Sequence, residues 1–267
     1  MKTKTSVIVL IAALFALFAN GCGDGGGSTP LLSDRIAIYD GTGGWHDSAI
    51  AAKAALVADS QSVDLINENN IQASLENYGL LVMTGSDPSQ LLMALGSVGR
   101  FQIEDFVQRG GGFIGLGIGS YSAADSVVWM SQPVLEPAIG LYNGLATGPL
   151  TTLAPPGGRA MVAVTLRDNL FNPQLLTNIW VAYHDGPALL VDYPPASSIG
   201  TIDLLGNTAA AVAFTRGAGR IVLFAVNPEF EENSLADGTD WGSDLTDPES
   251  EWFWLQYAAE WCLGQIQ

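Results

Sequence analysis

Two short apolar runs, each opened by glycine, constrain the fold of this chain more than any other feature. Residues 79–84 (GLLVMT) and 112–116 (GFIGL) are continuously apolar rather than alternating, a pattern typical of strands buried on both faces. Between them, Asp87 and Pro88 form a favourable helix start, a side-chain cap followed by proline at the first helical position. This helical stretch is interrupted near residues 96–99 and ends at Gly110. Buried strands joined by helices predict an α/β domain with a parallel sheet.

Further strands and helices extend this pattern along the chain. An Ala-rich helix over residues 48–58, which Asp47 can cap, lies between strands predicted at 35–39 and 62–66. A short helix is predicted from about Ser120. The second half is richer in strands, which are predicted at residues 160–166, 179–183, 209–215 and 220–226.

The C-terminal region is predicted to contain a hairpin turn and a closing helix. Residues 216–219 (RGAG) separate the last two strands and suit a hairpin turn. The closing helix is predicted to start from Asp247 as its cap, with Pro248 at its first position. Cys262 falls on one face of this helix with Leu255, Ala258 and Ala259, so it is predicted to be a core thiol.

The N-terminus has the features of a cleaved export signal. Lys2 and Lys4 precede an apolar run over residues 7–18, which is too short for the roughly 20 residues that a membrane-spanning helix needs. The small residues 19–21 (ANG) stand directly before Cys22 and resemble the lipobox of bacterial lipoproteins, although the family more often has leucine at the position of alanine. The resemblance implies that residues 1–21 are a lipoprotein signal peptide and that Cys22 receives a diacylglycerol. An ordinary secretory signal is the alternative.

The remainder divides into a linker and one domain. Residues 22–34 are rich in Gly, Ser and Asp and are expected to form a flexible linker. Residues 35–267 are long enough for a single domain with its own core. The lipid on Cys22 would tether this domain to a membrane of the bacterial cell envelope. Glycine after the cysteine favours the outer membrane in lipoproteins of this type, facing the periplasm or the cell surface.

The charge limits the classes of partner. The chain has 10 basic and 27 acidic residues and a formal net charge of −17. Loss of Lys2 and Lys4 with the signal would make the mature chain more negative still. A surface of this sign repels phosphate backbones, so no nucleic-acid partner is expected. It also cannot assist adhesion to anionic lipid, which leaves membrane attachment to the acyl chains.

Five motifs, taken in order, resemble the class I glutamine amidotransferase-like superfamily, in particular the group of the biotin-protein ligase N-terminal domain. Residues 111–121 (GGFIGLGIGSY) resemble its nucleophile-elbow segment, and residues 39–44 (YDGTGG) its first strand and loop. Residues 82–87, 180–187 and 222–229 stand where the group carries a Pro-Gly-Gly loop, a Tyr-Asn-Gly-Gly-Pro segment and a His-Pro-Glu strand end. The resemblance implies a flavodoxin-like three-layer sandwich with a mostly parallel central sheet.

The departures from this pattern bear directly on function. Amidotransferase chemistry needs a nucleophilic cysteine, a histidine base and an orienting carboxylate. By the resemblance, Gly117 stands at the nucleophile position, Asn227 at the base position and Glu229 at the carboxylate position. Glycine has no nucleophile and asparagine cannot accept a proton at neutral pH. The sequence therefore predicts a non-catalytic domain without a cofactor.

A binding cleft could survive the loss of the triad. We expect it to take a small carboxylate or amide ligand, or an envelope protein partner, and a purely structural scaffold is the alternative. The residues that the resemblance places around this cleft are Gly43, Gly44, Gly85, Ser86, Ile118, Gly119, Tyr121, His184 and Asp185. Backbone N–H groups of Gly85, Ser86, Ile118 and Gly119 are expected to converge there as a former oxyanion hole.

Three other kinds of chemistry remain open. A hydrolase could use Ser120 or Ser122 as a shifted nucleophile with His184 as its base. The glycines of residues 115–120 resemble a dinucleotide fingerprint, with imperfect spacing. The loop that carries Asp237, Asp240 and Asp244 offers oxygen ligands suited to calcium, although its spacing matches no EF-hand.

Overall fold

The computed structural model describes residues 33–167, 170–189, 196–206, 208–232, 235–247 and 249–266. The predicted signal peptide, the lipidation position Cys22 and residues 23–32 of the predicted linker lie outside the described residues, as does Pro248. Within the described part, no helix combines the length and the apolar character needed to cross a membrane.

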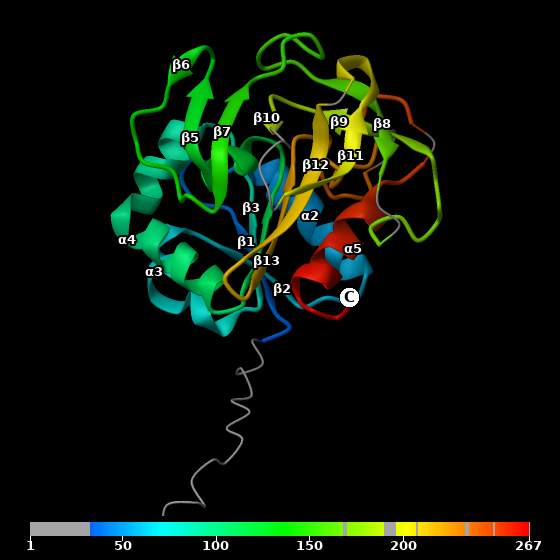
Figure 1. Cartoon of the computed structure of the whole chain (residues 1–267). Coiled ribbons are helices and arrows are strands. Elements are labelled where there is room, and N and C mark those ends of the chain that lie inside the picture. The colour runs from blue at the N-terminus through cyan, green and yellow to red at the C-terminus, as the bar shows by residue number, and fades with distance from the viewer. Residues whose placement is uncertain are drawn as a thin grey trace, which may run out of the picture. The chain divides into compact units, whose positions relative to one another are not determined.

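Five parallel strands form the centre of the sheet (Figure 1). They are ordered β2-β1-β3-β4-β13, and the neighbours pair in parallel register. Strands β1, β3 and β4 are buried at every position, as their continuous apolar sequences predict. The bounds are β1 Ile36–Tyr39, β2 Val63–Ile66, β3 Leu80–Met83, β4 Gly112–Gly115 and β13 Gly219–Phe224.

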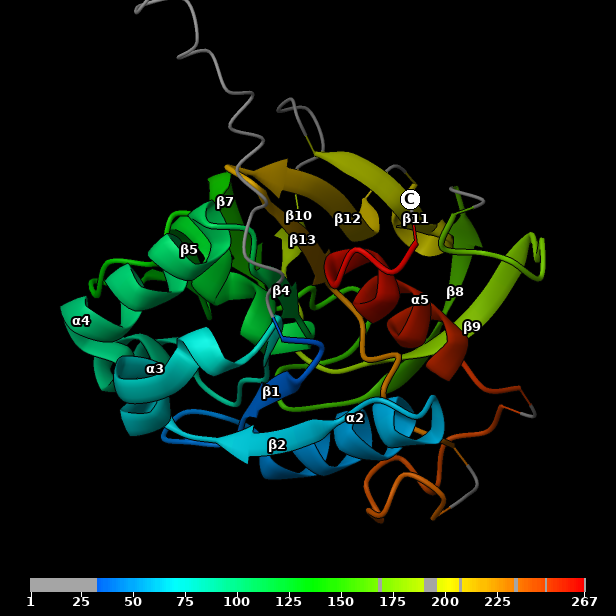
Figure 2. The same cartoon turned by 90° about the horizontal axis from the view of Figure 1, so that it is seen from below.

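Helices cover both faces of this sheet and give the predicted three layers (Figure 2). Helices α2 (His46–Ala58) and α5 (Trp252–Cys262) pack on the face that presents Ile38, Val82 and Ile114. Helices α3 (Glu68–Ser74) and α4 (Pro88–Gln108) pack on the opposite face, and the short helix η1 (Leu75–Asn77) follows α3. Alternate residues of each strand thus enter two separate cores, as the pleat requires.

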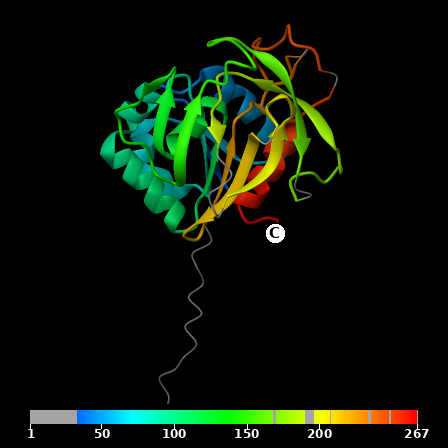
Figure 3. The ribbon, with the colours of Figure 1, turned by 45° about the horizontal axis from the view of Figure 1, so that its top comes forward.

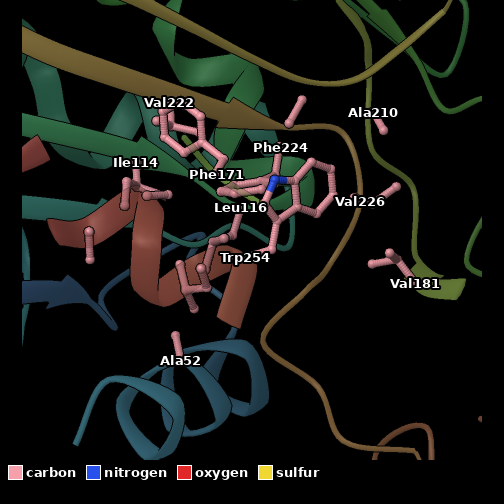
Figure 4. Close-up of a cluster of buried hydrophobic side chains, with 14 of the residues drawn as sticks. Ala52, Ile114, Leu116, Phe171, Val181, Ala210, Val222, Phe224, Val226 and Trp254 are labelled. Carbon is pink, nitrogen blue, oxygen red and sulfur yellow. The ribbon is translucent and has the colours of Figure 1, made fainter. Parts of the chain in front are cut away.

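The α5 core centres on Trp254, which is fully buried (Figure 4). Its ring lies edge-on to Phe224 of β13, with 5.0 Å between the ring centroids. Gln256 Nε2 donates to the Ala55 carbonyl at 2.8 Å and joins α5 to α2. Cys262 is buried, and its thiol lies 3.8 Å from the Phe113 carbonyl, so its assignment as a core thiol agrees with the structure.

The sheet continues beyond the parallel part as a mixed sheet of thirteen strands among the described residues (Figure 3). Strand β12 (Ala209–Arg216) leads into β13 through the predicted hairpin, with Gly217 at φ +58°. In the described part, seven strand pairings are antiparallel and five are parallel. The prediction of a mostly parallel central sheet therefore holds for the five central strands, whereas the sheet as a whole is mixed. After β4, where strands that follow one another directly along the chain pair, they pair as antiparallel neighbours, whereas β5 and β7 pair in parallel.

The remaining strands lie in two groups of this extension. Beside β12 come β10 (Ala188–Leu189), β7 (Tyr142–Gly148), β5 (Ala124–Trp129) and β6 (Gln132–Pro133). The second group is β11 (Ser197–Ile202), β8 (Ala160–Leu166) and β9 (Asn178–Tyr183), with the short helix η3 (Asp203–Leu205) after β11.

Helix boundaries agree with the predictions in α4 and differ in α2 and α5. Asp87 Oδ1 accepts the Gln90 N–H at 3.0 Å, and Gly96, at φ +58°, interrupts α4 within the predicted range. Helix α2 begins at His46 with Trp45 as its N-cap, so Asp47 lies in the first turn and is not the cap. Helix α5 begins at Trp252, later than predicted.

Candidate functional site

The segment after β4 makes a tight turn at the carboxyl edge of the parallel strands. Leu116 is extended (φ −111°, ψ 123°), Gly117 is left-handed at φ +48°, and the short helix η2 (Gly117–Ala123) begins there. Residues with a Cβ rarely adopt such a φ value, which makes glycine the favoured residue. The backbone therefore has the sharp strand-to-helix turn that a nucleophile elbow requires.

The side chain of Asn227 packs against this turn at Gly117. A Cβ atom at Gly117 would lie 2.6 Å from Asn227 Nδ2 and 3.1 Å from Oδ1. Asn227 Oδ1 accepts the His184 N–H at 3.1 Å, and Nδ2 donates to Glu229 Oε1 at 3.0 Å. The three positions assigned to the triad are thus brought together. In place of a nucleophile and a base, they present a glycine backbone and an amide.

Glu229 lies beneath this amide with no exposed surface. Ser48 Oγ donates to Glu229 Oε1 at 2.6 Å, whereas Oε2 is buried without a hydrogen-bond partner. Burial raises the pKa of Glu229 to about 7, because the desolvation of the charge outweighs the hydrogen bonds from Ser48 and Asn227. The carboxyl group therefore titrates near neutrality while it holds the Asn227 amide in place.

The loop after β3 contacts the elbow, but fewer of its N–H groups are free than predicted. A Cβ at Gly85 would lie 2.9 Å from the Gly119 nitrogen, so the two turns are in close contact. Yet the Gly119 N–H donates to the Leu116 carbonyl at 2.7 Å, and the Ser86 N–H donates to the Gly43 carbonyl at 2.9 Å. Ser86 Oγ also donates to the Gly44 carbonyl. The prediction that the Ser86 and Gly119 N–H groups point at a ligand is wrong, because the Gly119 N–H closes its own turn and the Ser86 N–H joins the loop after β3 to the glycine loop after β1.

Tyr121 and Asp185, both predicted to line the cleft, contact each other instead. Tyr121 is fully buried, and its hydroxyl donates to the Asp185 carbonyl at 3.2 Å. Burial raises the pKa of Tyr121 far above its ordinary value. Asp185, at φ +52°, accepts the Gly157 N–H at 2.8 Å, while burial raises the pKa of its carboxyl group. These two residues hold neighbouring loops together, which explains their place in the motif without a ligand.

A cluster of rings adjoins the elbow, and sequence reasoning missed it as a unit. We call Trp45, His184, Phe230 and Trp241 the elbow aromatic cluster. Ring centroids are 4.7 Å apart for Trp45 and His184, 5.0 Å for Trp45 and Trp241, and 4.1 Å for Phe230 and Trp241. The backbone N–H of Trp45 donates to Thr84 Oγ1 at 3.2 Å, which joins the start of α2 to the end of β3.

The cluster is half-buried and carries polar groups at its margin. Phe230 is buried, whereas Trp45, His184 and Trp241 are partly exposed. His184 Nδ1 lies 2.9 Å from the Gly158 carbonyl, which accepts a hydrogen bond from it. The Arg159 guanidinium lies 5.6 Å from the centroid of Trp241 and forms an ion pair with Asp244 at 2.6 Å. The only sequence signals for this arrangement were the tryptophan beside the glycine loop and the tryptophan of the acidic loop.

The calcium hypothesis does not fit the described loop. Asp237 is buried and accepts the N–H groups of Thr239 and Glu231, and Asp244 pairs with Arg159. Asp240 is exposed. In the described ranges, no group of three or more His, Cys, Asp or Glu side chains is placed to hold a metal ion.

The serines near the elbow are engaged elsewhere. Ser120 and Ser122 are fully buried, and their hydroxyls donate to the Phe224 and Gly119 carbonyls, each at 2.7 Å. A nucleophilic serine would need a base as its hydrogen-bond partner. This arrangement therefore does not favour the hydrolase alternative.

Comparison with known proteins identifies a family for most of the chain. Residues 35–249 match the model of the family described as "Biotin-protein ligase, N terminal". No curated protein sequence matches the chain.

Solved structures of similar fold are distant in sequence. A ThuA-like protein of Bacteroides uniformis has a TM-score of 0.57 at 10% identity, over 87% of this chain and 92% of its own. A cytoplasmic protein of Salmonella typhimurium has a TM-score of 0.51 at 12% identity, over 88% of this chain and 99% of its own. A Thermoplasma acidophilum protein described as "putative gmp synthase subunit a" has a TM-score of 0.50 at 10% identity, over 86% of this chain and 96% of its own. At these identities the likeness shows the fold alone.

Proposed function

The chain belongs to the family described as biotin-protein ligase, N terminal, and on that premise we propose that it is a non-catalytic, lipid-anchored binding protein of the bacterial cell envelope. The strand order β2-β1-β3-β4-β13 supports the finer classification of its domain as flavodoxin-like, within the class I glutamine amidotransferase-like superfamily. The lipid anchor on Cys22 rests on the lipobox resemblance.

One observation carries the proposed loss of catalysis: the Asn227 amide fills the space that a side chain at position 117 would need. Nucleophilic catalysis requires a side chain at the elbow and a base beside it that can take a proton. Asn227 instead joins the His184 backbone to Glu229 through both ends of its amide. These two hydrogen bonds hold the Asn227 amide against the turn at Gly117.

We infer that the elbow aromatic cluster binds a protein partner in the envelope. Partly exposed tryptophan rings beside an arginine are the residue types that dominate binding energy at protein interfaces. Trp45, Trp241 and Arg159 supply them, and the rings lie in direct contact, which leaves a preformed surface. A surface of this kind needs no catalytic residue.

A second candidate is a small carboxylate or amide ligand. His184 and Arg159 support it, because both lie at the margin of the same cluster in an otherwise acidic chain. A thermal-shift screen of amino acids and small carboxylates tests this candidate. Stabilisation that is lost in Arg159→Ala would favour it, and unchanged melting with every compound would exclude it.

Site-specific photo-crosslinking in the native cell tests the partner proposal. A photoreactive phenylalanine derivative at position 241 should give one discrete adduct, which Trp45→Ala in the same chain should abolish. The same derivative at Trp180, which is 53% exposed on β9, is the matched control. Equal adducts at both positions, or an adduct that survives Trp45→Ala, would contradict the assignment of the surface.

An assay for ammonia release tests the loss of catalysis separately. The purified chain should release no ammonia from glutamine above a buffer blank. Release that disappears in Glu229→Gln or Asn227→Ala would overturn the non-catalytic assignment.

A further inference from the structure

A second site lies away from the elbow, at the start of α5. A cavity of about 350 Å³ opens between the segment before β9 and the N-terminal end of α5. Its volume is within the roughly 300–1,000 Å³ typical of small-molecule sites. None of the residues that line it belongs to the elbow or to the elbow aromatic cluster.

The walls of this cavity combine carboxyl groups with apolar side chains. Leu176, Ile179 and Phe253 supply the apolar surface, and Glu249 and Glu251 the carboxyl groups. Gln174 and Ser250 complete the lining. Glu249 is exposed, whereas Glu251 is 1% exposed, so the lining includes one exposed and one buried acid.

The buried acid has no neutralising partner among the described residues. Glu251 Oε1 is buried without a hydrogen-bond partner, and so are both carboxyl oxygens of Glu232, which is 6% exposed. Burial and the charges of Glu232, Asp247 and Glu231 raise the pKa of Glu251 to about 10, and burial raises that of Glu232 to about 7. Buried ionised carboxylates are costly unless a cation or a proton compensates them.

We propose that this cavity binds a small aliphatic amine, with its ammonium group on Glu251 and its carbon chain against Leu176, Ile179 and Phe253. An ammonium donates up to three hydrogen bonds, which suits an acceptor that lacks a donor. Phe253 also brings an aromatic ring to the lining, a group to which cations are attracted.

A divalent metal fits this site less well than an amine. Calcium takes six to eight oxygen ligands at short range. The described part of the chain has no group of three acidic or histidine side chains placed to hold a metal ion. An ammonium needs only one buried carboxylate and tolerates the apolar wall.

Titration calorimetry on the full chain, purified in detergent, tests the proposal with 1,4-diaminobutane and butylamine at pH 8. We expect one saturable site for each amine and no binding of the isosteric neutral 1-butanol. Binding should release the proton of Glu251, so the measured heat should differ between Tris and phosphate buffers. Glu251→Gln should weaken binding roughly tenfold or more, the loss typical of a charged hydrogen bond. Glu260→Gln, on α5 but outside the cavity, should leave binding unchanged.

A second variant keeps the test independent of the carboxyl cluster. Leu176→Phe adds bulk to the apolar wall of the cavity while leaving every acid unchanged, and it should also abolish binding. Lack of saturable binding by both amines in the wild type would overturn the proposal, and so would equal binding of 1-butanol or full affinity in a folded Glu251→Gln. Calcium binding without amine binding would overturn the organic cation as the ligand.

Discussion

Gly117 and Asn227, at which the sequence departs from the amidotransferase pattern that it resembles, fit one another physically. The glycine removes a side chain at φ +48°, and the asparagine amide occupies the volume thereby left free. A side chain restored at position 117 would overlap the Asn227 amide unless residue 227 also changed. The pair therefore behaves as a packed structural unit rather than as two isolated losses.

Gly117→Ala should destabilise the fold by roughly 2–5 kcal/mol. The left-handed conformation costs a residue with a Cβ about 1–2 kcal/mol, and overpacking against Asn227 adds about 1–3 kcal/mol. Urea unfolding measures the difference. Gly157→Ala is the matched control, because Gly157 has φ +74° but a Cβ added there would meet nothing within 4 Å. Equal losses for the two variants would contradict the overlap with Asn227.

Glu229 should make stability depend on pH between about 4.5 and 7. Its pKa is raised from 4.5 to about 7 in the folded protein, so the folded state binds the proton more tightly than the unfolded state. Its stabilising contribution is fully present below the unfolded pKa and is lost as pH rises through the folded pKa. The loss amounts to about 3 kcal/mol for a shift of this size.

Glu229→Gln should flatten this part of the pH–stability curve, measured by urea unfolding at several pH values. The slope should not vanish, because Glu232 has a pKa raised to about 7 as well. The exposed Glu76→Gln serves as the control and should keep the wild-type slope. A Glu229→Gln curve parallel to the wild type would show that the carboxyl group is charged in the folded protein.

The residues of the elbow could be predicted from the sequence, whereas the aromatic cluster could not. Gly117, Asn227 and Glu229 lie in motifs at the ends of predicted strands, and parallel strands bring such ends to one edge of the sheet. Trp45 and Trp241 come from loops that lie far apart in the sequence. Their contact depends on the path of the acidic loop, which carries no periodic pattern.

At the scale of elements, the strands that could be predicted from the sequence are those buried on both faces of the sheet. Strands β1, β3 and β4 have continuous apolar sequences that need a cover on both faces, so their place in a parallel sheet followed directly. Strands β7 (YNGLATG) and β11 (SSIGTI) contain glycine and small polar residues, and long-range pairing with their neighbours makes them strands. Local propensity could not reveal them.

The start of α4 permits a quantitative test at this scale. Asp87→Ala removes the side-chain acceptor of the Gln90 N–H and should lower stability by about 1 kcal/mol. Thermal unfolding measures the loss. Asp47→Ala is the matched control, because Asp47 lies in the first turn of α2 without capping it, and its removal should cost no more than about 0.5 kcal/mol. Equal losses would show that Asp87 acts through its charge alone.

At the scale of the whole molecule, membrane attachment and the folded domain are separate problems. The net charge of −17 opposes attraction to anionic lipid, and no helix of the described residues could cross a bilayer. The proposed attachment therefore depends on an acyl-modified cysteine. The chain has two cysteines, and the sequence before Cys22 and the burial of Cys262 lead to opposite expectations for modification.

Metabolic labelling with an alkyne fatty acid in a bacterial host should modify Cys22 and leave Cys262 unmodified. Cys262 is buried against Phe113, and burial raises the pKa of its thiol far above the ordinary value, so it is neither accessible nor nucleophilic. Cys22→Ser should thus lose the label completely, while Cys262→Ser should keep the wild-type level, with mass spectrometry locating the modified residue. A labelled Cys22→Ser chain would contradict the proposed anchor. A wild-type chain that is cleaved elsewhere and carries no lipid would also contradict it and would favour an ordinary secretory signal.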